Sequence, residues 1–185
     1  MQTKTITTYS FDELDQEVQE KIAETWRAND SFFWEDEWLD SLKGFAEYFD
    51  ININDWSIDL YGRSYVYFDF KGDDQQKYTD FRGSLARSEI SGYRLYKMLL
   101  NRYSADFMKD CCFTGYCGDE VLMKPIREFI KKPSKNIDFY YLIECCFDEW
   151  IKAFTQDIEY WESFDCIKEE ILLNEVQFTE SGNLA

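Results

Sequence analysis

Six cysteines are the residues whose chemistry this sequence raises first. They are Cys111, Cys112, Cys117, Cys145, Cys146 and Cys166. Thiolates bind zinc, and the first three could meet the adjacent pair at 145 and 146 around one metal ion. The spacing differs from the C-x-x-C pattern of most zinc sites, and the chain contains no histidine. The sequence therefore favours small, buried, reduced thiols that hold no metal.

Carboxylates are the second set of side chains that could do chemistry. The chain carries 37 Asp and Glu against 20 Lys and Arg, a formal charge of −17. Because acids are so frequent, no pair marks a general acid and base, although a magnesium-binding cluster stays an open alternative. The lack of histidine removes the commonest catalytic base, and no hydrolase, zinc-protease, P-loop or dinucleotide motif occurs. We assign no catalytic residue, metal or cofactor, and we expect a binder rather than an enzyme.

The charge is distributed unevenly along the chain. Residues 1–60 carry 15 acids against 4 bases, residues 61–135 carry 10 against 14, and residues 136–185 carry 12 against 2. Such a field repels nucleic acids and membrane surfaces and attracts basic protein grooves. Helical acids at i, i+4 and i+7 also repeat about every 5–6 Å, which imitates the regular phosphates of DNA. The charge predicts a protein partner with a basic groove.

Two acidic helix faces supply the candidate partner-binding residues. They are Asp36, Asp40 and Glu47 on a helix expected over 33–49, and Glu144 and Asp148 on a helix that begins near residue 138. Apolar stripes on the opposite sides of both helices would turn these acids outward. Solvation is the ordinary explanation of such a face, and it competes with the partner-binding interpretation.

The basic centre of the chain supports an alternative role. Its cations alternate with tyrosines, and they could hold nucleic acid through phosphate contacts and stacking; they are Arg82, Arg87, Arg94, Lys97 and Arg102. The competing explanation is that they neutralise the acidic helices of the protein itself. We prefer this explanation, because the net field opposes nucleic acid.

The elements that position these residues predict an α+β fold. Alternating β-branched residues predict a strand at 3–9. Further strands are expected at 56–61, at 64–70, at 111–117 from its Phe-Thr-Gly-Tyr run, and at 175–180. The second and third form a hairpin around a turn at Gly62 and Arg63, and the first and last are expected to pair. The result is a short antiparallel sheet of three to five strands, covered by amphipathic helices in a single domain over residues 1–185.

Helical periodicity completes this organisation. Ser10 and Glu13 form a capping box, and the apolar residues that follow at i+4 steps begin a helix of about four turns. Further helices are expected in the second half of 82–109 and over 119–132, 138–158 and 162–174. The N-terminus lacks the apolar core of a signal peptide, and no apolar run is long enough to span a membrane. We therefore expect a soluble cytosolic protein.

Two segments near the ends of the chain carry recognisable motifs. Segment 6–27 reads ITTYSFDELDQEVQEKIAETWR, a Trp- and acid-rich helix is expected at 32–51, and segment 174–182 reads NEVQFTESG. This order resembles a family of small bacteriophage-encoded proteins of unassigned function, whose members have an opening strand, an FDELS-x-EA-x-EKA pattern and an N-E-x-x-F-T-x-x-G tail. The resemblance implies a phage or mobile-element origin and action inside a bacterial cell. It carries over no catalytic residue.

Together, charge and resemblance predict a phage anti-defence protein of the anti-CRISPR or anti-restriction type. It would bind the basic groove of a host defence nuclease stoichiometrically in the host cytoplasm, a CRISPR–Cas effector first and a restriction enzyme second. One alternative is an inhibitor that binds nucleic acid or processes guide RNA. The other is an antitoxin-like protein that masks a basic partner. A homodimer is left open.

Overall fold

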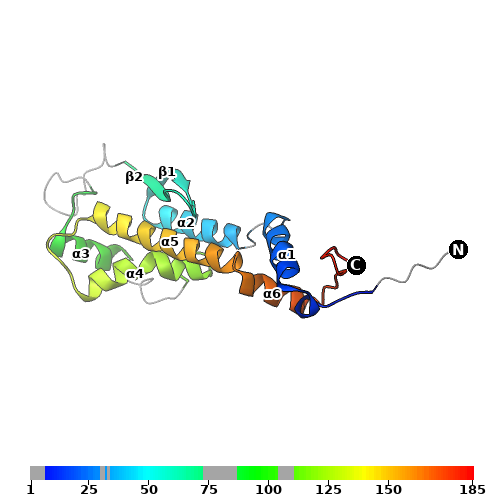
Figure 1. The fold of residues 1–185 in the computed structure, drawn as a ribbon. Helices are drawn as coiled ribbons and strands as arrows, with labels where there is room; N and C mark the ends of the chain where they lie inside the picture. Colours follow the sequence, from blue (N-terminus) through cyan, green and yellow to red (C-terminus); the bar gives the residue numbers. More distant parts are fainter. Residues whose placement is uncertain (1–6, 30–31, 33, 73–86, 104–110) are drawn as a thin grey trace. The chain divides into compact units, whose positions relative to one another are not determined.

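The computed structural model describes residues 7–29, 32, 34–72, 87–103 and 111–185. The chain divides into two compact units. The terminal unit comprises Met1–Phe33 with Gln156–Ala185, and the central unit comprises Trp34–Thr155. Six α-helices and a two-stranded antiparallel sheet lie in the described part, which confirms the α+β class (Figure 1). None of the described helices combines the length and apolar character needed to cross a lipid bilayer.

The two ends of the chain pair in the terminal unit. Tyr9 and Phe178 form an antiparallel bridge, with N–H to carbonyl distances of 2.8 and 2.9 Å between their backbones. The expected pairing is therefore confirmed, but as an isolated bridge and not as two strands. Residues 3–6 of the expected first strand lie outside the described residues.

The first helix begins later than the sequence predicts. Glu13 accepts a hydrogen bond from the backbone N–H of Ser10 at 2.8 Å, and this bond lowers the pKa of the Glu13 carboxyl. It closes only a 3-10 turn, η1 (Phe11–Glu13), after which the backbone is extended at Leu14. Helix α1 then spans Gln16–Asn29. The capping box was recognised correctly, but its assignment to the long helix was wrong.

Helix α6 (Phe164–Leu173) completes the terminal unit. The Ser163 hydroxyl accepts the backbone N–H of Cys166 at 3.2 Å, so a side chain satisfies one of the free donors at the helix start. The core of this unit brings together apolar side chains of η1, α1, α6 and the tail, namely Phe11, Leu14, Ile22, Ala23, Ile167, Ile171 and Phe178.

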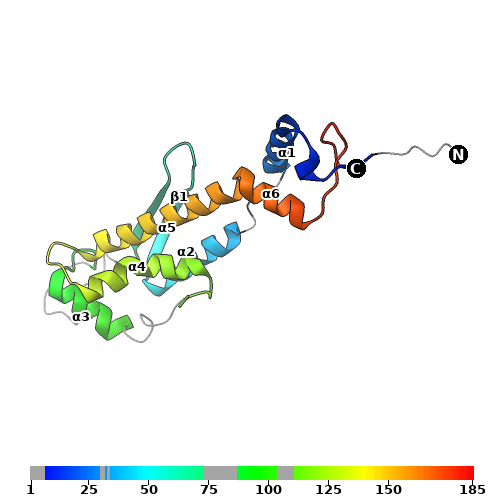
Figure 2. The same cartoon turned by 60° about the horizontal axis from the view of Figure 1, so that its bottom comes forward.

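The central unit is built from α2 (Glu35–Tyr48), α3 (Gly92–Tyr103), α4 (Cys117–Lys131) and most of α5 (Phe139–Trp161). Figure 2 shows α2, α4 and α5 running beside one another. Aromatic contacts hold them: Trp38 stacks on Phe154 with ring centroids 5.5 Å apart, and the indole N–H of Trp150 donates to the Trp38 carbonyl at 3.1 Å. The predicted apolar stripes of α2 and α5 are thus confirmed.

The sheet consists of β1 (Ile51–Ser57) and β2 (Tyr65–Phe70). Its register pairs Ile51 with Phe70 and Ser57 with Tyr65, and a bulge near Asn54 shifts the register by one residue. The described residues contain only these two strands, so the expectation of three to five was wrong. The connection spans residues 58–64, longer than the two-residue turn that Gly62 and Arg63 suggested.

The expected strand at 111–117 is instead a loop wrapped around a buried carboxylate. Asp119, which is 0% exposed, accepts backbone N–H groups of Phe113 and Thr114 at 2.7 Å and of Gly115 at 3.2 Å. The Thr114 hydroxyl donates to the same side chain at 2.9 Å. Since a buried carboxylate is stable only when hydrogen-bonded, Asp119 and the loop require each other. The local Phe-Thr-Gly-Tyr run could not reveal this contact with Asp119.

Candidate protein-binding groove

Helix α5 places two of the predicted partner-binding residues on one exposed face. Asp138 accepts the backbone N–H of Tyr141 at 2.8 Å, which caps the start of the helix. Glu144 and Asp148 follow one helical turn apart, and both are exposed. The opposite face of α5 buries apolar residues in the core, so this helix can direct its acids only outward.

Strand β2 lies beside this face because aromatic rings hold it there. Phe68 stacks on Tyr140 with centroids 4.7 Å apart and contacts Phe147 edge-on at 5.1 Å. Phe70 stacks on Phe139 at 4.9 Å. Since stacked and edge-on aromatic pairs stabilise packing beyond the area they bury, they fix the strand against the helix.

A groove of about 390 Å³ runs between β2 and α5, a volume within the range of ligand-binding sites. We call it the β2–α5 groove. It is lined by Asn54, Arg63, Ser64, Tyr65, Val66, Tyr67, Phe68, Tyr140, Tyr141, Glu144, Phe147, Asp148 and Ile151. Four tyrosines and two carboxylates thus share one concave surface, with a single arginine among the lining residues.

The negative charge of the groove is concentrated. Partial burial raises the pKa of the Glu144 carboxyl, and the nearby charges of Asp148 and Asp138 raise it further. The pKa of the Tyr140 hydroxyl is also raised, by burial first and then by Glu144 and Asp69. Both shifts mean that further negative charge is disfavoured here. A cation bound in the groove would relieve this repulsion.

The tyrosines give the groove aromatic surfaces. The rings of Tyr65 and Tyr67 stack with centroids 4.6 Å apart, and Tyr67 is 50% exposed. The Tyr65 hydroxyl donates to Asp55 at 3.0 Å, which orients its ring and raises the pKa of the hydroxyl. Aromatic faces next to carboxylates attract Arg and Lys side chains through cation–π contacts and ion pairs.

The other three predicted partner-binding residues lie elsewhere in the central unit. Asp36, Asp40 and Glu47 are exposed on α2, as the sequence predicted, but they do not line the groove. Asp40 pairs with Lys43 at 3.0 Å, which partly neutralises this face. The five acids therefore form two separate sets, and the groove described here combines the set on α5 with aromatic residues.

The basic candidates for nucleic-acid binding are also divided. Arg82 lies outside the described residues. Arg87 is 5% exposed; it donates to the Phe49 carbonyl at 2.8 Å and to the Asp50 carboxylate at 3.1 Å. Arg102 donates to the same carboxylate at 2.9 Å. These two arginines pair with one acid, Asp50, which lies between α2 and β1 and not on an acidic helix.

Arg94 and Lys97 are exposed on α3. The Lys97 ammonium lies 5.0 Å from the centroid of the Tyr93 ring, a distance typical of a cation–π contact. Two of the five basic candidates thus remain on an exposed helix face, which is a small surface for phosphate binding.

The cysteines lie in several environments. The Cys146 thiol is buried and donates to the Leu142 carbonyl at 3.1 Å, and burial raises its pKa well above the usual value. Burial also raises the pKa of Cys145 and Cys166. A raised pKa disfavours the thiolate, which is the form that binds metal, so these environments disfavour metal binding by the three thiols. Within the described residues no group of three His, Cys, Asp or Glu is arranged to hold an ion. The absence of zinc stays a prediction for elemental analysis.

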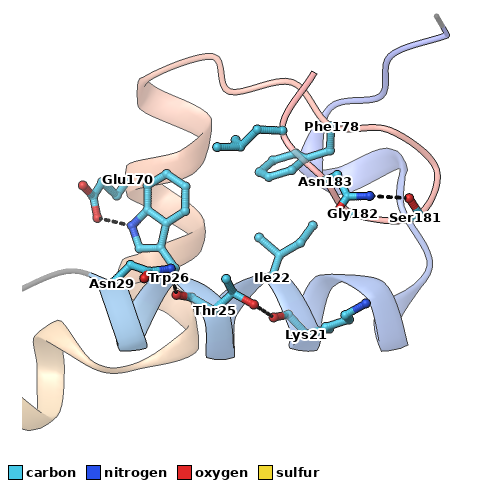
Figure 3. A pocket seen from close by; sticks show the side chains of 11 residues that line it. Lys21, Ile22, Thr25, Trp26, Asn29, Glu170, Phe178, Ser181, Gly182 and Asn183 are labelled. Carbon is cyan, nitrogen blue, oxygen red and sulfur yellow. Dashed lines mark hydrogen bonds between the residues drawn. The ribbon is translucent and has the colours of Figure 1, made fainter.

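The terminal unit contains a pocket that the sequence did not predict (Figure 3). We call this cavity of about 540 Å³ the tail pocket. It is lined by Lys21, Ile22, Thr25, Trp26, Asn29, Glu170, Phe178, Ser181, Gly182, Asn183 and Leu184. Trp26 forms one wall, and its indole N–H donates to the Glu170 carboxylate at 3.1 Å. The acid of this pocket is therefore engaged within the unit.

Gly182 explains how the tail reaches α1. Its φ of +83° lies in the left-handed region, and a Cβ built there would lie 2.9 Å from Cγ1 of Val18 and 3.2 Å from Cγ1 of Ile22. Glycine alone meets both requirements without strain. Two features of the sequence relate to this pocket: the helical stripe that includes Ile22 and Trp26, and Gly182 in the tail after Phe178. Neither feature predicts that a cavity forms.

Comparison of the chain with protein-family models, with curated proteins and with solved structures finds no match.

Proposed function

We propose that this protein is a stoichiometric inhibitor that binds a basic protein, and that the β2–α5 groove forms part of its binding surface. The observation that carries the proposal is the combination of Glu144 and Asp148 with four tyrosines in one groove. Partial burial and the charges of Asp148 and Asp138 raise the pKa of Glu144, and no cation among the described residues counters this shift. A cationic side chain of a partner would provide that charge.

A nucleic-acid-handling protein is the partner class that this surface fits best. Such proteins line their grooves with Lys and Arg to contact phosphates, and the net charge of −17 attracts those grooves over a long range. With the phage-like pattern of the sequence, this supports a host defence nuclease as the target. A CRISPR effector is the first choice and a restriction enzyme the second, with action in the bacterial host cytoplasm.

The nucleic-acid-binding alternative is less well supported. Arg87 and Arg102, two of its five residues, are engaged by Asp50 inside the central unit. The φ of Asp50 is +53°, which is unusual for a residue other than glycine. The two arginines hold the chain turn at this residue in place. Phosphate binding by these arginines would require that turn to lose its charge partners.

Titration against a defence nuclease tests the proposal. Increasing amounts of the protein are added to a fixed amount of a guide-loaded CRISPR effector, and DNA cleavage is measured. A stoichiometric binder abolishes cleavage only near equimolar amounts and needs no Mg²⁺ during preincubation. Inactivation at a hundredfold lower dose, or shortened guide RNA, would contradict the proposal and point to catalysis.

Charge-reversal variants test whether the groove is the binding surface. The double change Glu144→Lys with Asp148→Lys should weaken inhibition at least tenfold. Glu17→Lys with Glu24→Lys, on the exposed surface of α1, changes the net charge equally and serves as the control. A third variant, Asp36→Lys with Asp40→Lys and Glu47→Lys, tests the face of α2. Equal losses in the first two variants would assign the effect to net charge alone.

A further inference from the structure

The groove is lined by the edge of β2 as well as by side chains. Tyr65, Val66, Tyr67 and Phe68 are consecutive, and all four line the groove. Successive side chains of a strand point to opposite faces of the sheet. Four consecutive residues can therefore line one concavity only if the backbone edge of the strand borders it.

The hydrogen-bond register indicates which backbone groups lie along this edge. The N–H of Lys71 donates to the carbonyl of Asp50 at 2.8 Å, next to the pair formed by Ile51 and Phe70. Because antiparallel strands alternate between bonded and non-bonded pairs, Val66 and Phe68 direct their N–H and C=O groups away from β1. No backbone hydrogen bond joins either residue to a described segment beyond the hairpin.

The exposed face of α5 extends along the groove for the length of a short strand. Tyr141, Glu144, Asp148 and Ile151 all line it. Ile151 follows Tyr141 by ten positions along the helix, which corresponds to about 15 Å. An extended chain covers this distance in about four to five residues.

We propose that an extended basic segment of the partner adds to the β2 edge as a third strand. Its backbone would exchange hydrogen bonds with Val66 and Phe68, and its alternate Arg or Lys side chains would lie over α5 near Glu144 and Asp148. Backbone pairing provides affinity in this binding mode, and side-chain pockets provide specificity. This inference rests on the proposed function and adds the conformation in which the partner is bound.

Charge decides which strand this edge accepts. An unpaired edge can pair with any extended chain, including β2 of a second copy. A second copy would bring its own Asp69, Glu144 and Asp148 to the same place, and like charges close together oppose pairing. A segment rich in arginine or lysine meets the opposite charge, so the acids of α5 select it over a second copy.

Backbone-methylated peptides test this inference on the full chain. The probe is a fluorescent peptide of alternating arginine and valine, about seven residues long, which is enough to span the groove. In one control peptide every arginine is N-methylated, and in the other every valine is. Both controls keep the charge and the side chains, but each removes the donors on a different edge of the strand.

We expect the unmodified peptide to bind and exactly one of the two methylated peptides to lose at least tenfold in affinity. Amide hydrogen exchange at Val66 and Phe68 should slow at least tenfold when the peptide is bound. Equal binding of all three peptides would overturn strand addition and leave the basic-partner proposal standing, since charge alone would then explain binding. Absence of binding would overturn the inference, as would protected amides in a peptide-free dimer, which would assign the edge to a second copy.

Discussion

The β2–α5 groove and the tail pocket are concavities of different chemistry in one acidic chain. In the groove, partial burial and the nearby charges of Asp148 and Asp138 raise the pKa of the Glu144 carboxyl, and no cation among the described residues offsets this effect. Glu170, the one acid of the tail pocket, accepts the indole N–H of Trp26. An acid that is already engaged cannot attract a partner as strongly as one that is not. The groove can therefore select a cationic partner by charge, whereas the single acid of the tail pocket lies among apolar, polar and basic side chains, including Ile22, Asn29 and Lys21.

The two concavities also differ in how they are built. The groove depends on a strand edge and a helix face that aromatic contacts hold together. The tail pocket depends on the close approach of the tail to α1 at Gly182. Substitutions in the tail pocket should therefore affect the stability of the terminal unit. Substitutions in the β2–α5 groove should affect the charge dependence of binding.

Gly182→Val should have the largest effect. The new side chain would meet Val18 and Ile22 and would force a β-branched residue into the left-handed region. We expect a loss of about 2–4 kcal/mol in the free energy of unfolding, measured by thermal or denaturant unfolding. Gly115→Val is the control, because its φ is +93° but nothing lies within 4 Å of its Cβ position. Equal losses in both variants would show that backbone strain, and not the close approach, is decisive.

Reversing the groove acids should have the next largest effect. Glu144→Lys with Asp148→Lys should weaken the binding of the arginine–valine peptide by about ten- to a hundredfold, or about 1.4–2.7 kcal/mol. Added salt should then change the remaining affinity less than it changes that of the wild type. Fluorescence anisotropy measures both quantities. Unchanged affinity in a folded variant would show that the peptide binds outside the groove.

Trp26→Phe should have a smaller effect, confined to the terminal unit. The change keeps an aromatic ring but removes the hydrogen bond to Glu170. We expect a loss of about 0.5–1.5 kcal/mol in the free energy of unfolding, typical of one hydrogen bond. Peptide binding to the groove should stay unchanged. A changed peptide affinity would show that the two concavities are coupled.

Glu144→Gln should have the smallest effect on stability. The pKa of Glu144 is raised on folding, so the folded chain holds this proton more tightly than the unfolded chain does. That stabilisation is complete below the unfolded pKa and is lost as the pH rises through the folded pKa. At neutral pH the glutamine variant should therefore be slightly more stable, by no more than about 0.5 kcal/mol because solvent screens an exposed group.

Unfolding curves at several pH values check this last prediction. The advantage of the glutamine variant should shrink as the pH falls and Glu144 of the wild type takes up its proton. The wild type should also bind the peptide more weakly as the pH is lowered, since binding a cation requires the carboxylate form of Glu144. A glutamine variant that is less stable at neutral pH would show that the Glu144 charge is favourably paired.

The helices could be predicted largely because their signals are local. The apolar stripes that include Leu42 and Phe45 in α2 and Trp150 and Phe154 in α5 follow the 3.6-residue period and are buried as expected. The errors occurred where a distant or specific contact overrides local preference. The Phe-Thr-Gly-Tyr run within 111–117 suggested a strand, but the loop folds around Asp119. The capping box of Ser10 suggested a long helix, but it closes only a 3-10 turn.

The sequence by itself determined the net charge, the positions of most helices and the outward direction of Glu144, Asp148, Asp36, Asp40 and Glu47. These properties depend on composition and on neighbours within one or two helical turns. Only the tertiary structure decided which acids meet aromatic residues in a concavity and which arginines are engaged. Tyr67 and Glu144 are distant in sequence, as are Arg87 and Asp50, and side-chain periodicity carries no information on such pairs. Tyr67 and Glu144 meet because the aromatic residues of β2 pack on α5, and Arg87 and Asp50 meet in a half-buried ion pair. Both contacts follow from the packing of the whole core.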